Sequence, residues 1–514
     1  MPMITIRRGG EEPVILEAGR QESLLDVLRR AGLVVSAPCG GNGKCGKCRV
    51  QVTSWSGAYE WELACRTYVN RDMEILLPAE EQGGAICGEG SETVLFGGGT
   101  GYGAAVDIGT TTVVLRMYDM QTGTALGICR DWNAQRPYGA DVVTRMQYTM
   151  ENEQGLFQLT GLIRSQVLGM VDELCAEGGL DPAEVHTLYV AGNTVMQHLF
   201  AGIDPRSIAL APYVPEEYFD DGKSRSIPER PGLAIYYAPC VAGYVGGDIT
   251  AGILSSRVHV LPGRNLFLDV GTNGEMALST ETGFLCCSVA CGPAFEGAEI
   301  SCGMSSIPGA VCRVDWEDGK PVLEVIGGGK PRGLCGSGIL DLLALLLKFG
   351  VVDDTGRLLP PDEAPVALAD YLGEDEDGNG VFYLTEDRRV YFTAGDVRKI
   401  QLAKGAVAAG IALLLKEAGI GPEKVKELHI SGGFGNAMRP DSAAAIGMIP
   451  KELKERVRPA GNTALFGAAR ALCDPESREE LLKICRSCRY LELAGNPEFT
   501  QLFMEYMMFE SEDE

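Results

Sequence analysis

The sequence lacks several features that define large classes of proteins. No apolar run approaches the 18 residues that a membrane-spanning helix needs. No positively charged segment followed by an apolar one opens the chain, as a secretion signal would. Basic residues are outnumbered, since 45 Lys and Arg face 70 Asp and Glu, and the net charge of −25 repels nucleic acids and anionic membranes. We therefore expect a cytoplasmic protein that binds neither.

Histidine is also scarce, and the four that occur show no metal-ligand spacing: His186, His198, His259 and His429. Cysteine is abundant by contrast. Seventeen cysteines without a secretion signal indicate a reducing compartment, where thiols serve metal binding or packing, and an oxygen-poor habitat would suit so many. With 514 residues, 45% of them apolar, and 67 glycines, the chain is long enough for three or four well-packed domains.

Four cysteines near the N-terminus carry the strongest signal. Cys39, Cys45, Cys48 and Cys65 stand as C-x5-C-x2-C-x16-C. A [2Fe–2S] cluster needs four thiolates, and the plant-type pattern is C-x4-C-x2-C…C; the longer first gap resembles adrenodoxin-like ferredoxins. A structural zinc site is the alternative, but zinc ligands usually come as two close pairs. Three ligands crowd one loop here, so the spacing favours the iron–sulfur cluster.

The residues around these cysteines fit a cluster loop. Residues 3–8 and 13–18 are typical of a strand pair, and residues 22–33 are typical of an amphipathic helix. Glycines at 40, 41, 43 and 46 let the backbone wrap closely around a cluster. By its resemblance to ferredoxins we expect a β-grasp domain over residues 1–80. A glycine-rich linker follows at 81–103.

Two later parts of the chain repeat each other. The apolar strand and Asp-x-Gly-Thr turn at Asp107 recur at Asp269, an offset of 162 residues. A helix, a proline turn and a strand ending in glycine also recur, with Gly192 matching Gly432 at an offset of 240. The two offsets differ by 78 residues, which indicates an insertion in the second copy. We expect a first lobe at 104–262 and a second lobe at 263–514, with the insertion at 280–397 and a C-terminal tail.

The paired turns have a chemical interpretation. A glycine turn lets a phosphate approach backbone N–H groups and threonine hydroxyls, and an aspartate at a strand end can hold Mg²⁺ through water. Two facing hairpins would therefore clamp a polyphosphate. A single Asp-x-Gly-Thr is more often an ordinary hairpin, but the repeat together with the Gly-Gly-Phe-Gly turn at 432–435 favours a nucleotide site.

The order of elements resembles the acetate and sugar kinase, heat-shock protein and actin superfamily of ATPases. On that resemblance we expect a multidomain α/β protein whose two lobes have the ribonuclease-H-like fold, with hinge-side helices at 246–256 and 404–419. The fusion to a ferredoxin resembles the reductive activators of corrinoid-dependent methyltransferase systems. The motifs that carry this resemblance are GADVVTRM, VAGNTVMQHLF, CGPAFEGAEISCGM, GLCGSGILDLLA, ISGGFGN and YLELAGNPEFTQLF.

The superfamily resemblance implies roles for particular residues. Asp107 and Asp269 would place Mg²⁺, and Glu296 would orient the attacking water, although a helix-capping carboxylate is an equal alternative for Glu296. Glu275 would support its hairpin from behind. The phosphates would be bound by Gly109, Thr110, Thr111, Gly271, Thr272 and Asn273. The adenosine would be bordered by Gly432, Gly433, Phe434 and Gly435.

The family resemblance also implies a function. An ATP-dependent activator would pass low-potential electrons from its cluster to an inactive Co(II) corrinoid protein and restore Co(I) for methyl transfer. It would take electrons from an external donor and form a homodimer. The alternatives are an activator of 2-hydroxyacyl-CoA dehydratases, a redox-gated small-molecule kinase and a non-enzymatic scaffold. The sequence identifies neither the cognate corrinoid protein and its methyl donor nor the electron donor.

Two further groups of cysteines leave a choice open. Cys286, Cys287, Cys291 and Cys302 lie close in sequence, and Cys485 with Cys488 makes a C-x2-C. A second cluster or a redox pair is one interpretation. Packing is the interpretation we favour, because adjacent side chains in a strand point to opposite faces and free cysteine is commonly buried.

Overall fold

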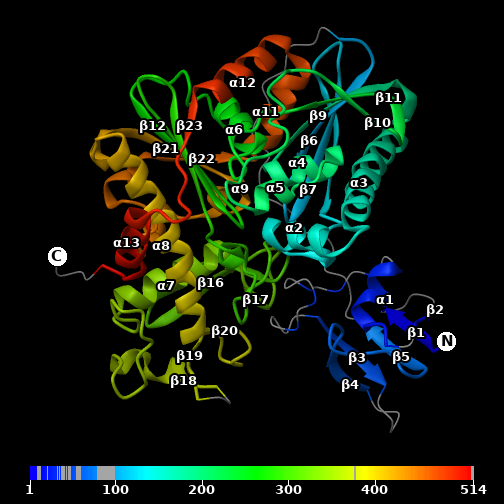
Figure 1. Cartoon of the computed structure of the whole chain (residues 1–514). Coiled ribbons are helices and arrows are strands. Elements are labelled where there is room, and N and C mark those ends of the chain that lie inside the picture. Colours follow the sequence, from blue (N-terminus) through cyan, green and yellow to red (C-terminus); the bar gives the residue numbers. More distant parts are fainter. Residues whose placement is uncertain are drawn as a thin grey trace.

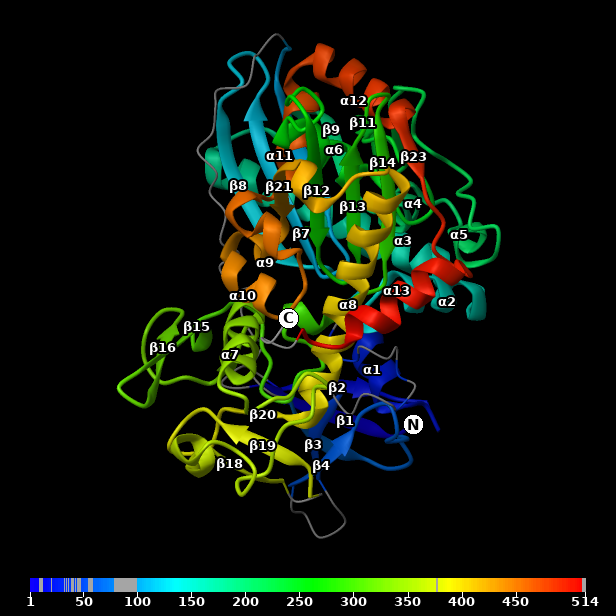
Figure 2. The ribbon, with the colours of Figure 1, turned by 90° about the vertical axis from the view of Figure 1, so that its left-hand side faces the viewer.

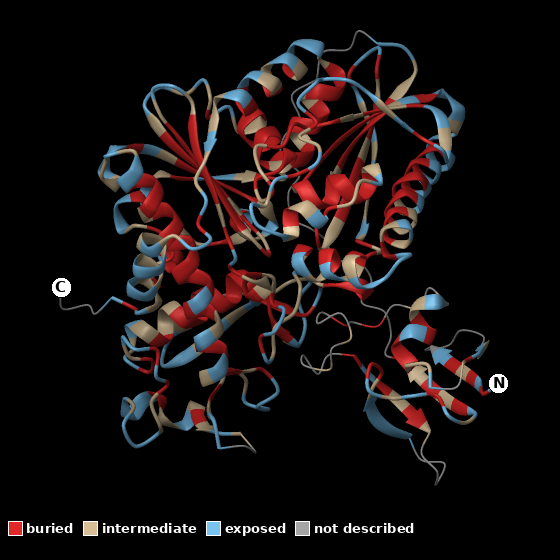
Figure 3. Ribbon diagram, in the orientation of Figure 1, coloured by how far each residue is buried: buried red, intermediate tan, exposed pale blue. Residues whose placement is uncertain are grey.

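The computed structural model describes residues 1–8, 13–19, 21–31, 33, 35, 37, 41, 43, 48–53, 59–77, 99–375 and 378–510. A small N-terminal unit lies beneath the first of two larger lobes (Figure 1). The view turned by 90° shows the same arrangement, with the insertion of the second lobe beside the N-terminal unit (Figure 2). In each lobe the central strands are buried and the outer helices are exposed on one side (Figure 3).

The N-terminal unit is a five-stranded mixed sheet in the order β2-β1-β5-β3-β4. Its elements are β1 (Met3–Arg8), β2 (Val14–Glu17), α1 (Leu24–Arg30), β3 (Arg49–Thr53), β4 (Tyr59–Leu63) and β5 (Met73–Leu77). The predicted strand pair is confirmed, because β1 pairs antiparallel with β2. The predicted helix is shorter than expected, and Ser23 caps its N-terminus by accepting from the Asp26 N–H at 3.2 Å.

The first lobe holds a six-stranded sheet in the order β10-β11-β9-β6-β7-β8. Its strands are β6 (Tyr102–Ile108), β7 (Thr112–Asp119), β8 (Ala125–Trp132), β9 (Val185–Gly192), β10 (Arg225–Ile227) and β11 (Arg230–Tyr237). Its helices are η1 (Arg136–Tyr138), α2 (Val142–Glu151), α3 (Gly155–Gly178), η2 (Pro182–Glu184), α4 (Thr194–Ala201), α5 (Arg206–Ala209) and α6 (Gly247–Ser256). The predicted hairpin is present, since β6 pairs antiparallel with β7.

The second lobe repeats this sheet in the order β22-β21-β12-β13-β14-β23. Its strands are β12 (Arg264–Val270), β13 (Gly274–Ser279), β14 (Phe284–Val289), β21 (Val425–Ser431), β22 (Val457–Gly461) and β23 (Cys488–Tyr490). Its helices are α8 (Ala394–Glu417), η5 (Pro422–Lys424), α9 (Gly432–Ala437), α10 (Pro440–Ala445), η6 (Lys451–Arg456), α11 (Thr463–Cys473), α12 (Pro475–Ser487) and α13 (Pro497–Met507). As in the first lobe, the central strand pairs antiparallel with its hairpin partner and parallel with the next strand.

Two small sheets lie between β14 and α8. The first has the order β16-β15-β17 and the second β18-β19-β20. Their elements, with the helices around them, are η3 (Pro293–Glu296), β15 (Ala310–Glu317), β16 (Lys320–Val325), β17 (Gly333–Leu334), α7 (Gly336–Lys348), η4 (Val366–Tyr371), β18 (Leu372–Glu374), β19 (Gly380–Tyr383) and β20 (Tyr391–Thr393). They form the lower left part of Figure 1.

The lobes meet through α6 and α11, which lie between the two large sheets (Figure 1). Both helices contain a glycine where they touch: a Cβ on Gly467 would lie 2.1 Å from the Ala251 carbonyl oxygen. The prediction of a hinge-side helix within 246–256 is thus consistent with α6. The prediction for 404–419 is wrong, because that segment belongs to α8, which packs on the other face of the second sheet. The apolar pattern alone did not reveal which face of the sheet a buried helix covers.

The predicted fold class is confirmed: the chain is a multidomain α/β protein with a ferredoxin-type sheet and a two-lobed ATPase fold. Cys286 and Cys287 lie on opposite faces of β14, as alternation along a strand requires, and neither side chain is accessible to solvent. No helix in the described part of the chain is both long and apolar enough to span a bilayer.

Candidate functional site

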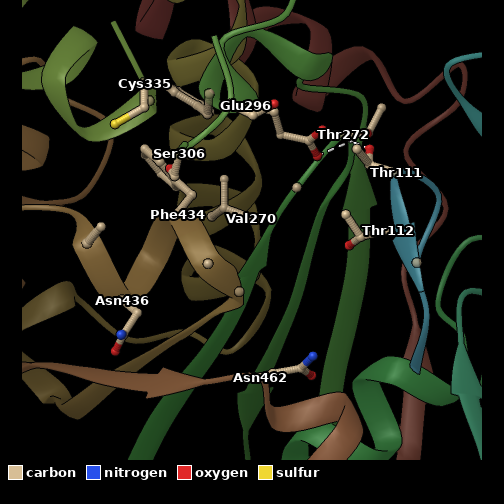
Figure 4. A pocket seen from close by; sticks show the side chains of 18 of the residues that line it. Thr111, Thr112, Val270, Thr272, Glu296, Ser306, Cys335, Phe434, Asn436 and Asn462 are labelled. Carbon is tan, nitrogen blue, oxygen red and sulfur yellow. Dashed lines mark hydrogen bonds between the residues drawn. The ribbon is translucent and has the colours of Figure 1, made fainter. Parts of the chain in front are cut away.

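A cavity of about 890 Å³ lies between the two lobes, at the turns of both hairpins. Figure 4 shows it with Thr111 and Thr112 from the first lobe opposite Thr272 from the second. Of the predicted catalytic and nucleotide-binding residues, the lining includes Asp107, Gly109, Thr110, Thr111, Asp269, Gly271, Thr272, Asn273, Glu296, Gly432, Gly433 and Phe434. Residues up to 327 positions apart in sequence therefore share one surface.

Gly435 is the one predicted residue that does not line the cavity. A Cβ at this position would lie 2.4 Å from Cγ2 of Ile430 on β21. The absence of a side chain therefore allows α9 to pack against its own sheet, and it does not make room for a ligand. Gly432 differs, because its φ of +88° is in the left-handed region that favours glycine.

Glu296 joins the two hairpins. The Thr111 hydroxyl donates to its Oε2 at 2.9 Å and the Thr272 hydroxyl donates to its Oε1 at 3.2 Å. Figure 4 shows the carboxylate between these two threonines. The side chain thus faces the cavity from η3 and makes no helix-capping bond in this arrangement. A carboxylate in this place can exchange its threonine partners for the phosphate oxygens of a ligand.

Two asparagines that the sequence analysis missed complete the floor of the cavity. The Asn462 amide donates to Asp107 Oδ2 at 2.8 Å, and the Asn193 amide donates to the Thr110 hydroxyl at 3.0 Å. Each asparagine also caps the helix that follows it, α11 and α4 respectively. The signal was available, because the tripeptide Gly-Asn-Thr occurs both at 192–194 and at 461–463.

Burial raises the pKa of five of the carboxyl groups that line this cavity. The pKa of Asp107 is raised to about 7 and that of Asp269 to about 6. Asp248, on the first turn of α6, has a pKa raised to about 8 by burial and by the charges of Asp269 and Asp107. The pKa values of Glu275 and Glu296 are also raised, first by burial. Such a cluster of destabilised carboxylates is typical of a cation-binding or catalytic site.

The opposite end of the cavity is lined by aromatic and apolar groups. The rings of Phe434 and Phe295 stack with their centroids 5.0 Å apart. Gly336, at the start of α7, lies so close that a Cβ there would be 2.9 Å from the Phe434 ring. Arg313 also lines this end, and its buried Nη1 has no hydrogen-bond partner in the structure. A planar, polar ligand fits such a mixture of ring faces and one guanidinium.

Only part of the predicted cluster site can be described. Cys48 and Cys65 are buried, and their sulfur atoms lie 3.3 Å apart without a disulfide. Cys39 and Cys45 lie outside the described residues. Within the described ranges no group of three or more His, Cys, Asp or Glu side chains is arranged to hold a metal ion. This holds for Cys286, Cys287, Cys291, Cys302, Cys485 and Cys488, so a second metal cluster built from them has no structural support.

Three family models match the chain: a 2Fe-2S iron-sulfur cluster binding domain at residues 9–70, the RACo middle region at 102–260, and the C-terminal domain of RACo, the ASKHA domain, at 264–514. The corrinoid activation enzyme RamQ of Eubacterium limosum is 33% identical over 421 residues, which are 79% of this chain and 70% of that protein. The chain belongs to the family of corrinoid activators.

Two further similarities agree with this family. The [Co(II) methylated amine-specific corrinoid protein] reductase of Methanosarcina barkeri is 24% identical over 439 residues, 78% of this chain and 76% of that protein. A solved structure titled reductive activator for corrinoid, iron-sulfur protein superposes with a TM-score of 0.72 at 27% identity. The superposition covers 100% of this chain and 99% of the chain in that structure. The similarity thus extends over all five sheets described above.

Proposed function

We propose that this protein is an ATP-dependent reductive activator of a corrinoid protein. One electron from a [2Fe–2S] cluster in the N-terminal domain reduces one inactive Co(II) centre of the partner to Co(I). An external low-potential donor then reduces the cluster again by one electron. The observation that carries this proposal is the combination of two features in one chain. The ferredoxin-type domain holds a buried pair of thiols, and the cavity between the two lobes is lined by carboxylates and by the turns of both hairpins.

The described part of the cluster site fits the cofactor. Two thiolates about 2.3 Å from one tetrahedral metal are roughly 3.8 Å apart, so the 3.3 Å between the Cys48 and Cys65 sulfurs suits ligands of one iron. Cys39 and Cys45 would supply the other two thiolates. A bound [2Fe–2S] cluster supplies a one-electron carrier of low potential. The apolar surroundings of Cys48 exclude water from that side of the cluster.

The interlobe cavity suits Mg·ATP. Mg²⁺ is usually held by one or two carboxylates together with water and substrate phosphates, so Asp107 and Asp269 form an adequate donor set. The hydroxyls of Thr110, Thr111 and Thr272 and the amide of Asn273 would donate to phosphate oxygens. The ring of Phe434 would border the base, and Gly432 and Gly433 would leave room for the ribose.

Glu296 would then act on the attacking water. When phosphate oxygens take over the threonine hydroxyls, its carboxylate is free to accept the water proton while the water oxygen bonds to the γ-phosphorus and the bond to ADP breaks. Burial raises the pKa of Glu296, which makes the ionised form a stronger base. Glu275, buried beside the second hairpin, would shape the charge of the site without contacting the nucleotide.

ATP is needed because electron transfer to Co(II) is uphill from an ordinary ferredoxin near about −400 mV. A gap of ~30 mV is about 0.7 kcal/mol for one electron, and conformational coupling of a few kcal/mol bridges several such steps. Closure of the lobes on ATP would alter the docked corrinoid protein, for example its cobalt ligation. A homodimer remains a prediction from the family, which sedimentation of the purified protein tests.

The decisive experiment mixes the purified protein, a chemical reductant and a Co(II) corrinoid protein with and without ATP, and follows the visible spectrum. We expect the Co(I) spectrum only with ATP. Equal reduction in both samples would refute the coupling to ATP. Cys48→Ala should abolish reduction while nucleotide affinity stays within about twofold. If Cys48→Ala also loses nucleotide binding, the division of labour between the two parts of the chain is wrong.

A further inference from the structure

Residues 133–139, here termed the coupling segment, join the end of β8 to the start of α2 and include η1. They are bonded to the first hairpin at several points. Asn133 donates from its amide to the Gly109 carbonyl at 2.8 Å, and its backbone N–H donates to the Thr111 carbonyl at 2.9 Å. Asn133 is 1% exposed, so these bonds do not compete with water. Any movement of the hairpin turn is therefore transmitted to the start of the coupling segment.

A buried arginine makes a second connection. Arg145 on α2 donates to the Thr110 carbonyl of the hairpin, and it also donates to the Gly139 carbonyl at 3.0 Å and to Gln135 Oε1 at 3.2 Å. It is inaccessible to solvent, and burial lowers its pKa to about 9. A cation in this position, with hydrogen bonds in place of a carboxylate partner, is costly to move independently of its acceptors. It therefore holds the hairpin and both ends of the coupling segment together.

The other side of the coupling segment contacts the ferredoxin-type domain. Arg29, in the last turn of α1, donates to the Pro137 carbonyl, and its guanidinium lies 5.1 Å from the centroid of the Tyr138 ring. Its side chain is 8% exposed although α1 is a surface helix. Figure 1 shows α1 beneath α2. Tyr138 is itself fixed, since Gln158 donates to its hydroxyl at 2.9 Å.

Arg29 also lies beside the loop that carries the cluster cysteines. A Cβ added to Gly41 would be 3.7 Å from Arg29 Nη1 and 3.1 Å from Leu25 on the same helix. Gly41 stands two residues after Cys39 in the sequence. Packed groups thus form a continuous series: hairpin turn, Asn133 and Arg145, coupling segment, Arg29, cluster loop.

We propose that the coupling segment is the docking surface of the ferredoxin-type domain, and that its occupation by Arg29 is energetically linked to nucleotide binding at the first hairpin. This inference rests on the proposed function, because the ligand of the hairpin is taken to be ATP. Nucleotide phosphates that draw the Thr110 and Thr111 hydroxyls from their present partners, the Asn193 amide and the Glu296 carboxylate, shift the backbone that Asn133 and Arg145 hold. The coupling segment then changes its fit to Arg29 and moves the cluster domain relative to the lobes.

Linkage makes this proposal measurable, because coupling between two sites is reciprocal. If nucleotide alters docking by some factor, then loss of docking alters nucleotide affinity by the same factor, typically fivefold or more. Arg29 and Arg145 are positioning residues in this scheme, since neither touches the nucleotide. Arg30 is the matched control, because it neighbours Arg29 on α1 but bonds to Glu22 and the Glu17 carbonyl.

The docking contact is tested by hydrogen–deuterium exchange of the full-length, cluster-loaded protein without nucleotide. Arg29→Ala should raise exchange in residues 136–145 severalfold, and Arg30→Ala should leave it unchanged. Tyr138→Leu tests the same contact from the other side and should raise exchange in residues 24–31. The visible absorption of the cluster confirms that each variant is folded. Unchanged exchange in both Arg29→Ala and Tyr138→Leu would overturn the docking surface.

The linkage is tested by titrating the same proteins with a fluorescent, non-hydrolysable ATP analogue. Arg29→Ala should change the dissociation constant at least about fivefold, while Arg30→Ala stays within twofold of the wild type. If Arg29→Ala alters exchange but leaves the dissociation constant within twofold, the surface stands and the linkage is refuted. If the wild type binds no analogue, the proposed nucleotide site and the linkage both fail. If it binds the analogue but does not reduce Co(II), only the proposed function fails.

Discussion

The two hairpins at the cavity share a sequence pattern and a fold but are held differently. In the first, Asn133 and Arg145 bind the carbonyls of Gly109 and Thr110 from buried positions. In the second, the Gly271 N–H donates to Asn273 within the turn itself. The Gly271 carbonyl there is contacted by the Cys291 thiol at 3.4 Å, and a thiol is a weak donor. The Glu296 carboxylate accepts from a threonine hydroxyl of each turn, so it does not distinguish them.

This difference indicates two uses of one repeated unit. A turn held by a fixed cation and a buried amide transmits its movement to the residues around it, here toward the ferredoxin-type domain. A turn held by its own backbone can adapt to a ligand without disturbing its lobe. On the proposed function, both sides of the clamp would bind the nucleotide and only the first would transmit its movement to the ferredoxin-type domain. The predictions below test this asymmetry in order of decreasing expected effect.

The hairpin aspartates should remain equivalent despite the asymmetry. Asp107→Asn and Asp269→Asn each remove a charge that would hold Mg²⁺, so each should lower the rate of ATP hydrolysis by about 100-fold or more. The cluster spectrum should not change in either variant. Phosphate release under saturating ATP measures the rates. A variant of either aspartate that retains near-normal turnover would show that only one hairpin binds the metal.

Buried cations provide the next test, because each lobe contains one. Arg145→Met should lower nucleotide affinity by about tenfold and reduce the free energy of unfolding by about 3–5 kcal/mol, since several buried acceptors lose their donor. Lys404→Met is the control in the second lobe. Burial lowers the pKa of Lys404 to about 8, and its Nζ donates to the Met508 carbonyl at 2.5 Å; Lys404 does not line the interlobe cavity.

We therefore expect Lys404→Met to change thermal stability but not nucleotide affinity. Isothermal titration of both variants and a melting curve for each separate the two effects. Equal loss of affinity in Arg145→Met and Lys404→Met would mean that affinity follows stability in general. In that case the first hairpin would have no special connection to its lobe.

The sequence revealed the parts of this molecule that repeat or that have a fixed spacing. The strand pair at the N-terminus, both hairpins and the two-lobed fold followed from local patterns, because strand alternation and glycine turns depend on neighbours in sequence. Asn193 and Asn462 were missed although their Gly-Asn-Thr motif repeats. A helix-capping residue gives no sign in sequence that its amide also reaches a distant turn.

Two other misses have a different cause. The helix expected at the hinge proved to be α8 on the opposite face of its sheet, since a helix that is apolar around most of its surface does not indicate which face it covers. Asp248, Arg313 and the Arg29 contact arise only from tertiary packing. Asp248 stands 21 residues before Asp269, and Arg29 stands 108 residues before Pro137, and no local pattern encodes such contacts.

The two hairpin aspartates should contribute to the pH dependence of stability over ranges whose upper limits lie about one pH unit apart. The pKa of Asp107 rises from 3.8 to about 7, whereas that of Asp269 rises to about 6. A carboxyl with a raised pKa binds more protons in the folded state than in the unfolded chain. Stability therefore falls as pH rises from about 4 through the folded pKa. One unit corresponds to about 1.4 kcal/mol.

Without metal or nucleotide, the melting temperature of the wild type should therefore fall between pH 5 and 7.5. Asp107→Asn should flatten this fall up to about pH 7, and Asp269→Asn only up to about pH 6. Melting curves at half-unit intervals give the comparison. Identical profiles for the two variants would contradict the difference between the two environments. Burial raises the pKa of both aspartates, and the Asn462 bond to Asp107 and the Ser431 bond to Asp269 each oppose that rise.

The smallest effect is expected at Cys291, whose thiol contacts the Gly271 carbonyl of the second hairpin. Cys291→Ala removes a weak S–H bond and little volume, so nucleotide affinity should change by less than twofold. Asn133→Ala makes the matching deletion at the first hairpin. It removes the buried amide donor and leaves its acceptor carbonyl without that bond, so nucleotide affinity should fall by about tenfold. Titration of both variants with the same nucleotide under one condition compares their affinities. If Cys291→Ala proves as damaging as Asn133→Ala, then the second turn is held as firmly as the first. The asymmetry would then lie in the contact with Arg29 alone.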